Sequence, residues 1–155
     1  MLETTILAVG KLRSYYREAC DEYAKRLRRM ASVQEFEVRE GRGNTAEEIE
    51  QDEGSRLLQH MPKRSVLVAL TRDGSSWTSK DLAGRLERWS FEARPVSFAI
   101  GGSTGLSKTL LADAQFRWSL GPLTLPHELA RVVVYEQLYR GFSILRNEPY
   151  HKGKG

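Results

Sequence analysis

The chain has 155 residues, with 24 Lys and Arg, 20 Asp and Glu, and a single cysteine, Cys20. That length predicts one domain over residues 1–155 with a full hydrophobic core, and a lone cysteine excludes an internal disulfide and leaves no Cys/His cluster for zinc or iron–sulfur binding. The apolar run near the N-terminus is too short for a signal peptide or a membrane span, so we expect a cytoplasmic protein, whose net charge of +4 favours an anionic partner only slightly.

The first third of the chain predicts a strand, a helix and a second strand. Residues 4–9 are apolar or β-branched and stop at a glycine, which is typical of a buried strand. Apolar residues recur every three or four positions over residues 14–30, which predicts an amphipathic helix. Cys20 lies beside its apolar stripe, so we interpret it as a core thiol rather than a nucleophile. Residues 33–38 alternate polar and apolar side chains, as a half-buried strand near a sheet edge does.

The middle of the chain repeats this alternation with a more apolar strand. Thr45 followed by Glu48 predicts a capping box that opens a polar helix ending before Pro62. Residues 65–70, SVLVAL, are continuously apolar after the first position, as expected of an interior parallel strand. Residues 71–76 contain an aspartate followed by a glycine, and we expect a loop there.

Two more strands and two more helices are predicted after this loop. Thr78 followed by Asp81 predicts a second capping box at the start of a helix. Residues 95–100, PVSFAI, are typical of another strand, which runs directly into a glycine-rich turn. A short helix is predicted over residues 107–112, and a final short strand over residues 116–120.

The last apolar stretch begins at Pro126, whose missing N–H suits a first helical turn. Apolar residues then cover more than one face of the predicted helix up to about Phe142, which is typical of a helix buried on more than one side. At 1.5 Å per residue this helix spans roughly 27 Å, about the width of a small domain. Two interpretations of the pattern stay open: a core helix that closes a single-chain fold, or the spine of a dimer.

Strands that alternate with helices predict an α/β fold with a mostly parallel sheet covered by helices on both faces. Ligands of such sheets bind beyond the carboxyl ends of the strands. Three loops are therefore expected to form a ligand site: residues 70–74, 101–105 and 120–125.

The glycine-rich turn IGGSTG follows a strand and precedes a helix, so its glycines suit the close approach of a backbone to a nucleotide. Its spacing does not match the dinucleotide-binding pattern GxGxxG, and no GK[ST] ends the run as in a Walker loop. A plain tight turn is the alternative interpretation of this segment.

The last third of the chain holds most of the titratable side chains suited to chemistry. His127 begins the predicted helix, where a capping or surface role is the alternative to catalysis. Glu136 and Arg140 share one helix face and are consistent with a simple salt bridge. Tyr150 and His151 lie on a basic tail that is either reactive or unstructured.

These segments together resemble one known family. TLPHELARVVVYEQLYRGFSI followed by PYHK, with FAIGGSTGLS and the opening ILAVGKL, is similar to the ribosomal RNA large subunit methyltransferase H family (RlmH) of the SPOUT superfamily. The resemblance covers the chain from end to end. It implies transfer of a methyl group from S-adenosyl-L-methionine to N3 of a pseudouridine in 23S ribosomal RNA, on the assembled ribosome. It also implies a deep C-terminal trefoil knot and a homodimer, with no metal and no membrane partner.

The resemblance carries over to particular residues. It implies a catalytic group with His127 or His151 assisting deprotonation, Arg140 holding a phosphate or uracil carbonyl, and Tyr150 orienting the base. In a family whose sites form across the dimer, Tyr150 and His151 are expected to complete the pocket of the partner subunit. The implied cofactor-binding residues are Leu70, Gly101, Gly102, Gly105, Leu120, Gly121, Pro122, Leu123, Thr124 and Leu125.

Two other functions compete with this one. A non-catalytic ribosome-binding or assembly factor would keep the fold without needing the cofactor. A superfamily enzyme acting on a ribose oxygen of transfer RNA is the other, which the short chain and the specific C-terminal motif disfavour. The tail of Gly153, Lys154 and Gly155 is either an RNA phosphate contact or a disordered end.

Overall fold

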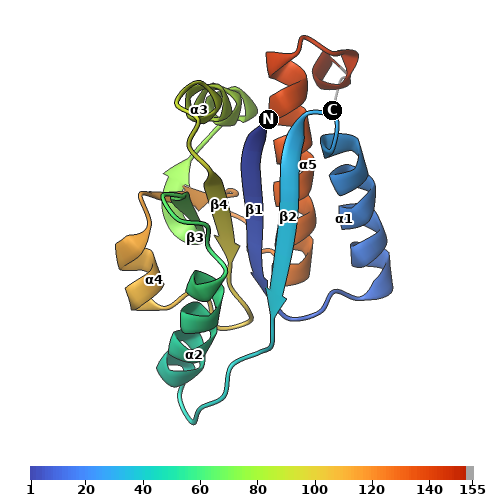
Figure 1. Ribbon diagram of the computed structural model, residues 1–155. Helices are drawn as coiled ribbons and strands as arrows, with labels where there is room; N and C mark the ends of the chain where they lie inside the picture. The colour runs from blue at the N-terminus through green and yellow to red at the C-terminus, as the bar shows by residue number, and fades with distance from the viewer. Residues whose placement is uncertain (153–155) are drawn as a thin grey trace.

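The computed structural model describes residues 1–152, which form one sheet of five parallel strands with helices on both faces (Figure 1). The strand order is β2-β1-β4-β3-β5. This confirms the predicted α/β class. In chain order the elements are β1 Leu2–Val9, α1 Ser14–Leu27, β2 Ala31–Val38, α2 Ala46–Gln59, β3 Val66–Ser76, α3 Ser79–Phe91, β4 Val96–Ile100, α4 Lys108–Asp113, β5 Phe116–Ser119, α5 His127–Leu145 and the 3₁₀ helix η1 Pro149–Lys152.

The sheet separates two hydrophobic cores, because side chains of a strand point alternately to its two faces. On β1, Ile6 and Ala8 belong to the core beneath α1, α3 and α5. Leu7 and Val9 belong to the smaller core beneath α2 and α4. A strand with both faces buried needs apolar residues at successive positions, which explains the continuous apolar runs of β1, β3 and β4.

The edge and interior positions predicted for two strands are confirmed. β2 pairs only with β1 and lies at one edge of the sheet. β3 lies between β4 and β5.

The predicted loop over residues 71–76 is wrong, since β3 continues through Ser76. Its pairing with β5 shifts register between Leu70 and Ser75, while Trp118 pairs with both. The extra residues form an irregularity of the bulge type, which a strand tolerates when a partner strand holds the segment on both sides of it. The Asp-Gly pair therefore lies in the bulge and not in a free turn.

The two predicted capping boxes differ in the structure. Thr78 and Asp81 form both reciprocal hydrogen bonds at the start of α3, at 2.8 and 3.0 Å. At α2, Thr45 accepts from the Glu48 amide at 3.1 Å, but the Glu48 carboxylate accepts from the Asn44 amide and not from that of Thr45. The prediction for Thr45 and Glu48 is therefore only half right, because the chain before α2 turns so that the Asn44 amide reaches the carboxylate.

Helix α1 ends at Leu27, three residues earlier than expected, because Ala31 already belongs to β2. Cys20 is fully buried in the larger core. Burial raises the pKa of the Cys20 thiol to about 12, which confirms a structural cysteine.

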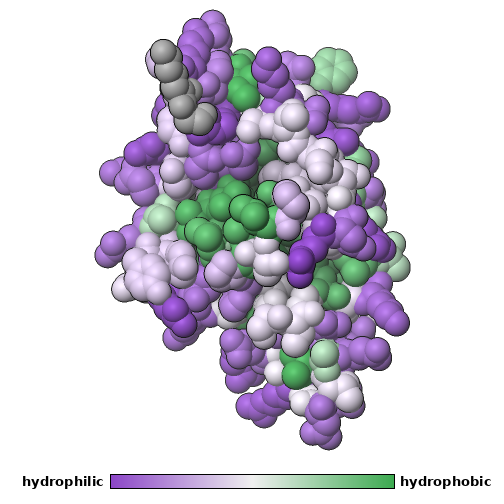
Figure 2. Space-filling view, turned by 180° about the vertical axis from the view of Figure 1, so that it is seen from behind, coloured by the Kyte–Doolittle hydropathy of each residue, from purple (hydrophilic) through white to green (hydrophobic). Residues whose placement is uncertain are grey.

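Helix α5 is the central helix of its face and packs against both α1 and α3. Pro126 stands at its N-cap and not within its first turn, and the helix continues to Leu145, beyond the expected end at about Phe142. Leu138 and Phe142 are buried, whereas Leu129, Val132 and Val133 are only partly covered. Figure 2 shows hydrophobic side chains gathered on the side of the sheet where α5 lies. The helix thus closes the core and also presents apolar surface.

The C-terminal segment folds back as η1, so the PYHK motif is ordered in this structure. Figure 1 shows the last turns of α5 and η1 at the end of the sheet where the strands begin. The expectations for Gly153, Lys154 and Gly155 concern residues outside the described part of the chain. No helix within residues 1–152 is long and apolar enough to cross a membrane.

Candidate active site

A cavity of about 530 Å³ lies where β4 and β5 end and α5 begins. Its walls are formed by the ends of these two strands, the loop that follows β5, and residues 70–72 of β3, where the bulge begins. It has the size and mixed character of a pocket for a small ligand. Its lining residues are Leu70, Thr71, Arg72, Ile100, Gly101, Gly102, Ser103, Thr104, Gly105, Trp118, Ser119, Leu120, Gly121, Leu123, Thr124, Leu125, Pro126, His127 and Ala130.

The structure brings the predicted cofactor residues together at this cavity. Each of them lines it except Pro122, which stands exposed in the loop after β5. The three segments that were expected to be loops therefore meet at one place, although residues 70–74 lie within β3. Parallel strands make this possible, because their carboxyl ends all lie at the same edge of the sheet.

The glycine turn after β4 has no room for side chains at its first position. A Cβ at Gly101 would lie 2.7 Å from the carbonyl carbon of Gly105. The amide of Gly105 donates to the carbonyl of Gly102 at 3.2 Å, and Gly105 has a φ of +99°. Gly101, Gly102 and Gly105 therefore form a tight turn, and these residues, which have no side chains, line the cavity.

The loop after β5 supplies a second wall of backbone. Ser119 receives a hydrogen bond from the Gly121 amide at 3.2 Å, and Gly121 adopts a φ of +125° that a residue with a side chain would rarely take. Leu123 is 76% exposed at the cavity mouth, while Trp118 is buried at its base. The pocket therefore has an apolar floor and a backbone rim.

His127 is the one predicted catalytic residue that lines the cavity in this chain. It is the first residue of α5, half-buried, directly after Pro126. The neighbouring Glu128 accepts a hydrogen bond from the Arg13 amide at 2.7 Å, which ties the start of α5 to the segment after β1. The histidine is thus held on a fixed helix end at the cavity wall.

The other three predicted catalytic residues gather at the far end of α5. Arg140 forms a salt bridge with Glu136 at 2.8 Å, as expected from the spacing, and its guanidinium lies 5.0 Å from the ring centre of Tyr150. Tyr150 donates to Glu136 at 2.8 Å, and His151 Nδ1 lies 3.1 Å from Ser143 Oγ. Burial and the bond to Glu136 raise the pKa of Tyr150.

This cluster does not reach the cavity of its own chain. Arg140 lies thirteen positions after His127 on the same helix, which amounts to roughly 20 Å along the axis. None of Arg140, Tyr150 and His151 lines the cavity. The predicted site is therefore split into two parts at opposite ends of α5.

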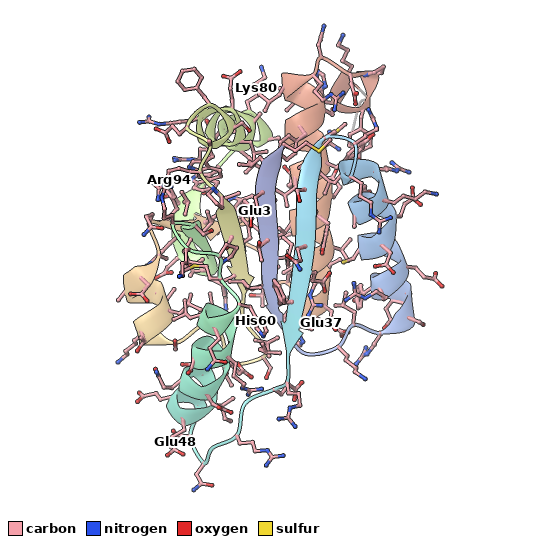
Figure 3. The ribbon with its side chains drawn as sticks, viewed as in Figure 1. Glu3, Glu37, Glu48, His60, Lys80 and Arg94 are labelled. Atoms are coloured by element: carbon pink, nitrogen blue, oxygen red, sulfur yellow. The ribbon has the colours of Figure 1, made fainter. Side chains whose placement is uncertain are left out.

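The sequence patterns missed a buried ion network beside the site. Arg131 is 1% exposed and donates to Glu35 at 2.9 Å, to Glu37, and to the carbonyls of Val9 and Gly10 at 3.1 and 2.8 Å (Figure 3, where Glu37 is labelled on β2). It locks α5 to the carboxyl end of β1. The sequence feature that could have revealed this network is the pair Glu35 and Glu37, which lie on one face of an edge strand. Arginines on α1 and α5, the helices on that side of the sheet, supply the opposite charge.

Arg17 of α1 completes the network, with salt bridges of 2.7 Å to Glu35 and 2.6 Å to Glu37. Burial by itself raises the pKa of Glu35, but hydrogen bonds from Arg17 and Tyr135 outweigh it and leave this pKa below its ordinary value. Glu35 is thus held as a charged carboxylate. Nowhere in residues 1–152 do three His, Cys, Asp or Glu side chains gather as a metal site would require.

Comparison with known proteins gives a consistent result over almost the whole chain. A family model described as a predicted SPOUT methyltransferase matches residues 2–151. Similar proteins are named ribosomal RNA large subunit methyltransferase H: that of Rubrobacter xylanophilus is 46% identical, covering 95% of this chain and 96% of that protein. The protein of Xylella fastidiosa is 39% identical, covering 99% and 100%, and that of an Anaeromyxobacter species is 43% identical, covering 95% and 97%.

Proposed function

We propose that this chain, which belongs to the SPOUT methyltransferase family, methylates large-subunit ribosomal RNA at N3 of a pseudouridine with S-adenosyl-L-methionine as methyl donor. The observation that carries the proposal is the cavity formed by the carboxyl ends of β4 and β5 and the bulge of β3. The near full-length similarity to ribosomal RNA large subunit methyltransferase H proteins supports the class of substrate. The assembled ribosome, and hence the cytoplasm, is where we expect the protein to act.

The cavity fits the methyl donor in size and chemistry. Its volume of about 530 Å³ is in the range of small-molecule pockets. Leu70, Ile100 and Leu120 offer apolar contact to an adenine ring, while the bare backbone around Gly101 and Gly121 offers amides and carbonyls. When bound, S-adenosyl-L-methionine supplies a methyl group already activated by a sulfonium. The protein then has to position the target nitrogen in line and receive its proton.

Side chains of the two separated clusters suit these tasks if two subunits combine. His127 stands at the cavity wall as one potential proton acceptor. The partner subunit's His151 is the other, with the partner subunit's Tyr150 to stack on the base and the partner subunit's Arg140 to hold a carbonyl or phosphate. We infer a homodimer that pairs through α5, whose Val132 and Val133 leave apolar surface only partly covered. The family resemblance also predicts a deep C-terminal trefoil knot.

Basic side chains around the cavity suit an RNA substrate. Arg72 lines the cavity from β3 and is exposed. Lys11 and Arg13 follow β1, and Arg39 follows β2, at the same edge of the sheet, and all three are exposed. Phosphate contacts of this kind give attraction without sequence specificity and weaken as salt rises.

Methyl transfer from labelled S-adenosyl-L-methionine to ribosomes and separated subunits of a strain lacking this protein tests the proposal. We expect label in large-subunit RNA, with the modified position mapped to N3 of one pseudouridine. Label on a ribose, or only on transfer RNA, would overturn the assignment. Calorimetry that detects no binding of S-adenosyl-L-methionine would favour a non-catalytic ribosome-binding factor.

A further inference from the structure

Glu53 of α2 is a buried acid that the site as described does not use. It is 3% exposed. Its Oε2 accepts a hydrogen bond from the Gly41 amide at 2.8 Å. Its Oε1 is buried and has no hydrogen-bond partner among the described residues, nor does the carboxylate form a salt bridge there. Such a group costs folding free energy unless something compensates its charge.

This carboxylate lies directly behind the wall of the cavity. A Cβ built at Gly102 would lie 3.3 and 3.4 Å from its two oxygens. Gly102 is itself one of the residues that line the cavity, whereas Glu53 is not. The Val9 side chain also borders Gly102, at 3.1 Å from the same Cβ position. A Cβ at Gly41 would lie 2.9 Å from Glu53 Cγ, so this glycine also leaves its space to the glutamate. Gly102, which has no side chain, therefore lies between the carboxylate and the cavity.

The charges around Glu53 leave it without a cation of its own. Arg56 acts on this carboxyl by its charge and lowers the Glu53 pKa, but its guanidinium donates to Asp52 at 2.9 Å. Glu40 and Asp52 add negative charge around it, and burial is the main cause that raises the pKa of the Glu53 carboxyl. At a pH above that pKa, the ionised Glu53 carboxylate places an uncompensated negative charge beside this wall of the cavity.

We propose that Glu53 makes the cavity prefer the positively charged methyl donor over the product left after transfer. This inference rests on the proposed use of S-adenosyl-L-methionine. The donor has a net charge of +1, because its sulfonium adds to a balanced ammonium and carboxylate, whereas S-adenosyl-L-homocysteine is a neutral thioether with no net charge. Loss of the sulfonium charge removes the attraction to Glu53, so the product is released more readily than the donor.

The expected effect follows from the distance. The carboxylate oxygens lie 3.3 and 3.4 Å from a Cβ built at Gly102, so a ligand charge packed against Gly102 would lie several ångströms farther away. Attraction over about 7 Å at an effective dielectric constant of about 20 corresponds to at least about a tenfold difference in affinity. A neutral ligand of the same shape gains nothing from this interaction.

Isothermal titration at pH 8 with S-adenosyl-L-methionine and S-adenosyl-L-homocysteine tests the proposal in the full-length protein. Glu53→Gln keeps the size of the side chain and an oxygen to accept from Gly41, and removes the charge. We expect the ratio of the product Kd to the donor Kd to fall about tenfold in Glu53→Gln. Glu47→Gln, an exposed change of the same kind in the same helix, should leave the ratio unchanged.

Equal weakening of both ligands in Glu53→Gln would show a purely structural role and overturn the proposal, as would an unchanged ratio. If the glutamine variant does not fold, Glu53→Asp is the second variant, since it keeps the charge. The ratio of the product Kd to the donor Kd should then stay close to that of the wild-type protein. A ratio that falls about tenfold in Glu53→Asp would also contradict the proposal. Wild-type protein that fails to bind the donor would instead refute the proposed function, so the two failures are distinguishable.

Discussion

Replacement of Arg131 by methionine should destabilise the fold far more than loss of any surface ion pair. Methionine keeps much of the length and apolar volume but removes the donors to Glu35, Glu37, Val9 and Gly10. Breaking a buried ion pair costs about 3–5 kcal/mol. We expect about 3 kcal/mol here, at the low end of that range, because the Glu35 and Glu37 side chains are 15% and 30% exposed and keep Arg17 as a partner.

Urea and thermal unfolding followed by circular dichroism measure the effect. A loss of about 3 kcal/mol corresponds to a fall in Tm of roughly 6–12 °C for a protein of this size. Arg88→Met is the matched control, since Arg88 is 78% exposed and pairs with Glu92 at 3.5 Å. It should change stability by less than about 0.5 kcal/mol. An Arg131→Met protein as stable as the Arg88→Met protein would refute the reasoning.

The dependence on pH provides a second check of the same network. The pKa of Glu35 is lowered in the folded state, so its contribution to stability is fully present above its unfolded pKa of about 4.3. That contribution is lost as pH falls through the folded value. The stability gap between wild-type and Arg131→Met protein should therefore narrow below about pH 4. A gap that widens in acid would contradict the assignment of a charged Glu35.

Three further predictions concern the site. Gly101→Ala should weaken binding of S-adenosyl-L-methionine by at least about tenfold in calorimetry, because its Cβ would lie 2.7 Å from Gly105 backbone; Gly84→Ala, with no atom within 4 Å, should leave affinity unchanged and stabilise α3 by roughly 0.5–1 kcal/mol. Val133→Asp on α5 should give a folded monomer by light scattering that no longer transfers methyl groups; a dimeric variant would argue against pairing through α5. At least one of His127→Ala and His151→Ala should slow single-turnover methylation and alter its pH profile, and wild-type behaviour of both would rule out a histidine base.

Secondary structure was largely predictable because its signals are local. The run SVLVAL is apolar on both faces, which suits only an interior strand, and the structure places it between two others. Thr78 and Asp81 predicted the start of α3, because the capping box that they form depends on only four successive residues. The extension of β3 over residues 71–76 was missed because its pairing with β5 is a long-range interaction across a bulge.

The sequence by itself located the cavity that we propose for the cofactor, since ligands of parallel sheets bind at the carboxyl ends of strands and the ends of β4 and β5 are visible in the chain. Only the tertiary structure showed that Tyr150 and His151 fold back onto α5 beside Arg140 and away from the cavity, because the packing of η1 on α5 is decided by tertiary contacts. It also decided which polar residues are buried. Arg131 and Glu53 look like ordinary surface residues of helices, and only the elements packed around them remove them from water.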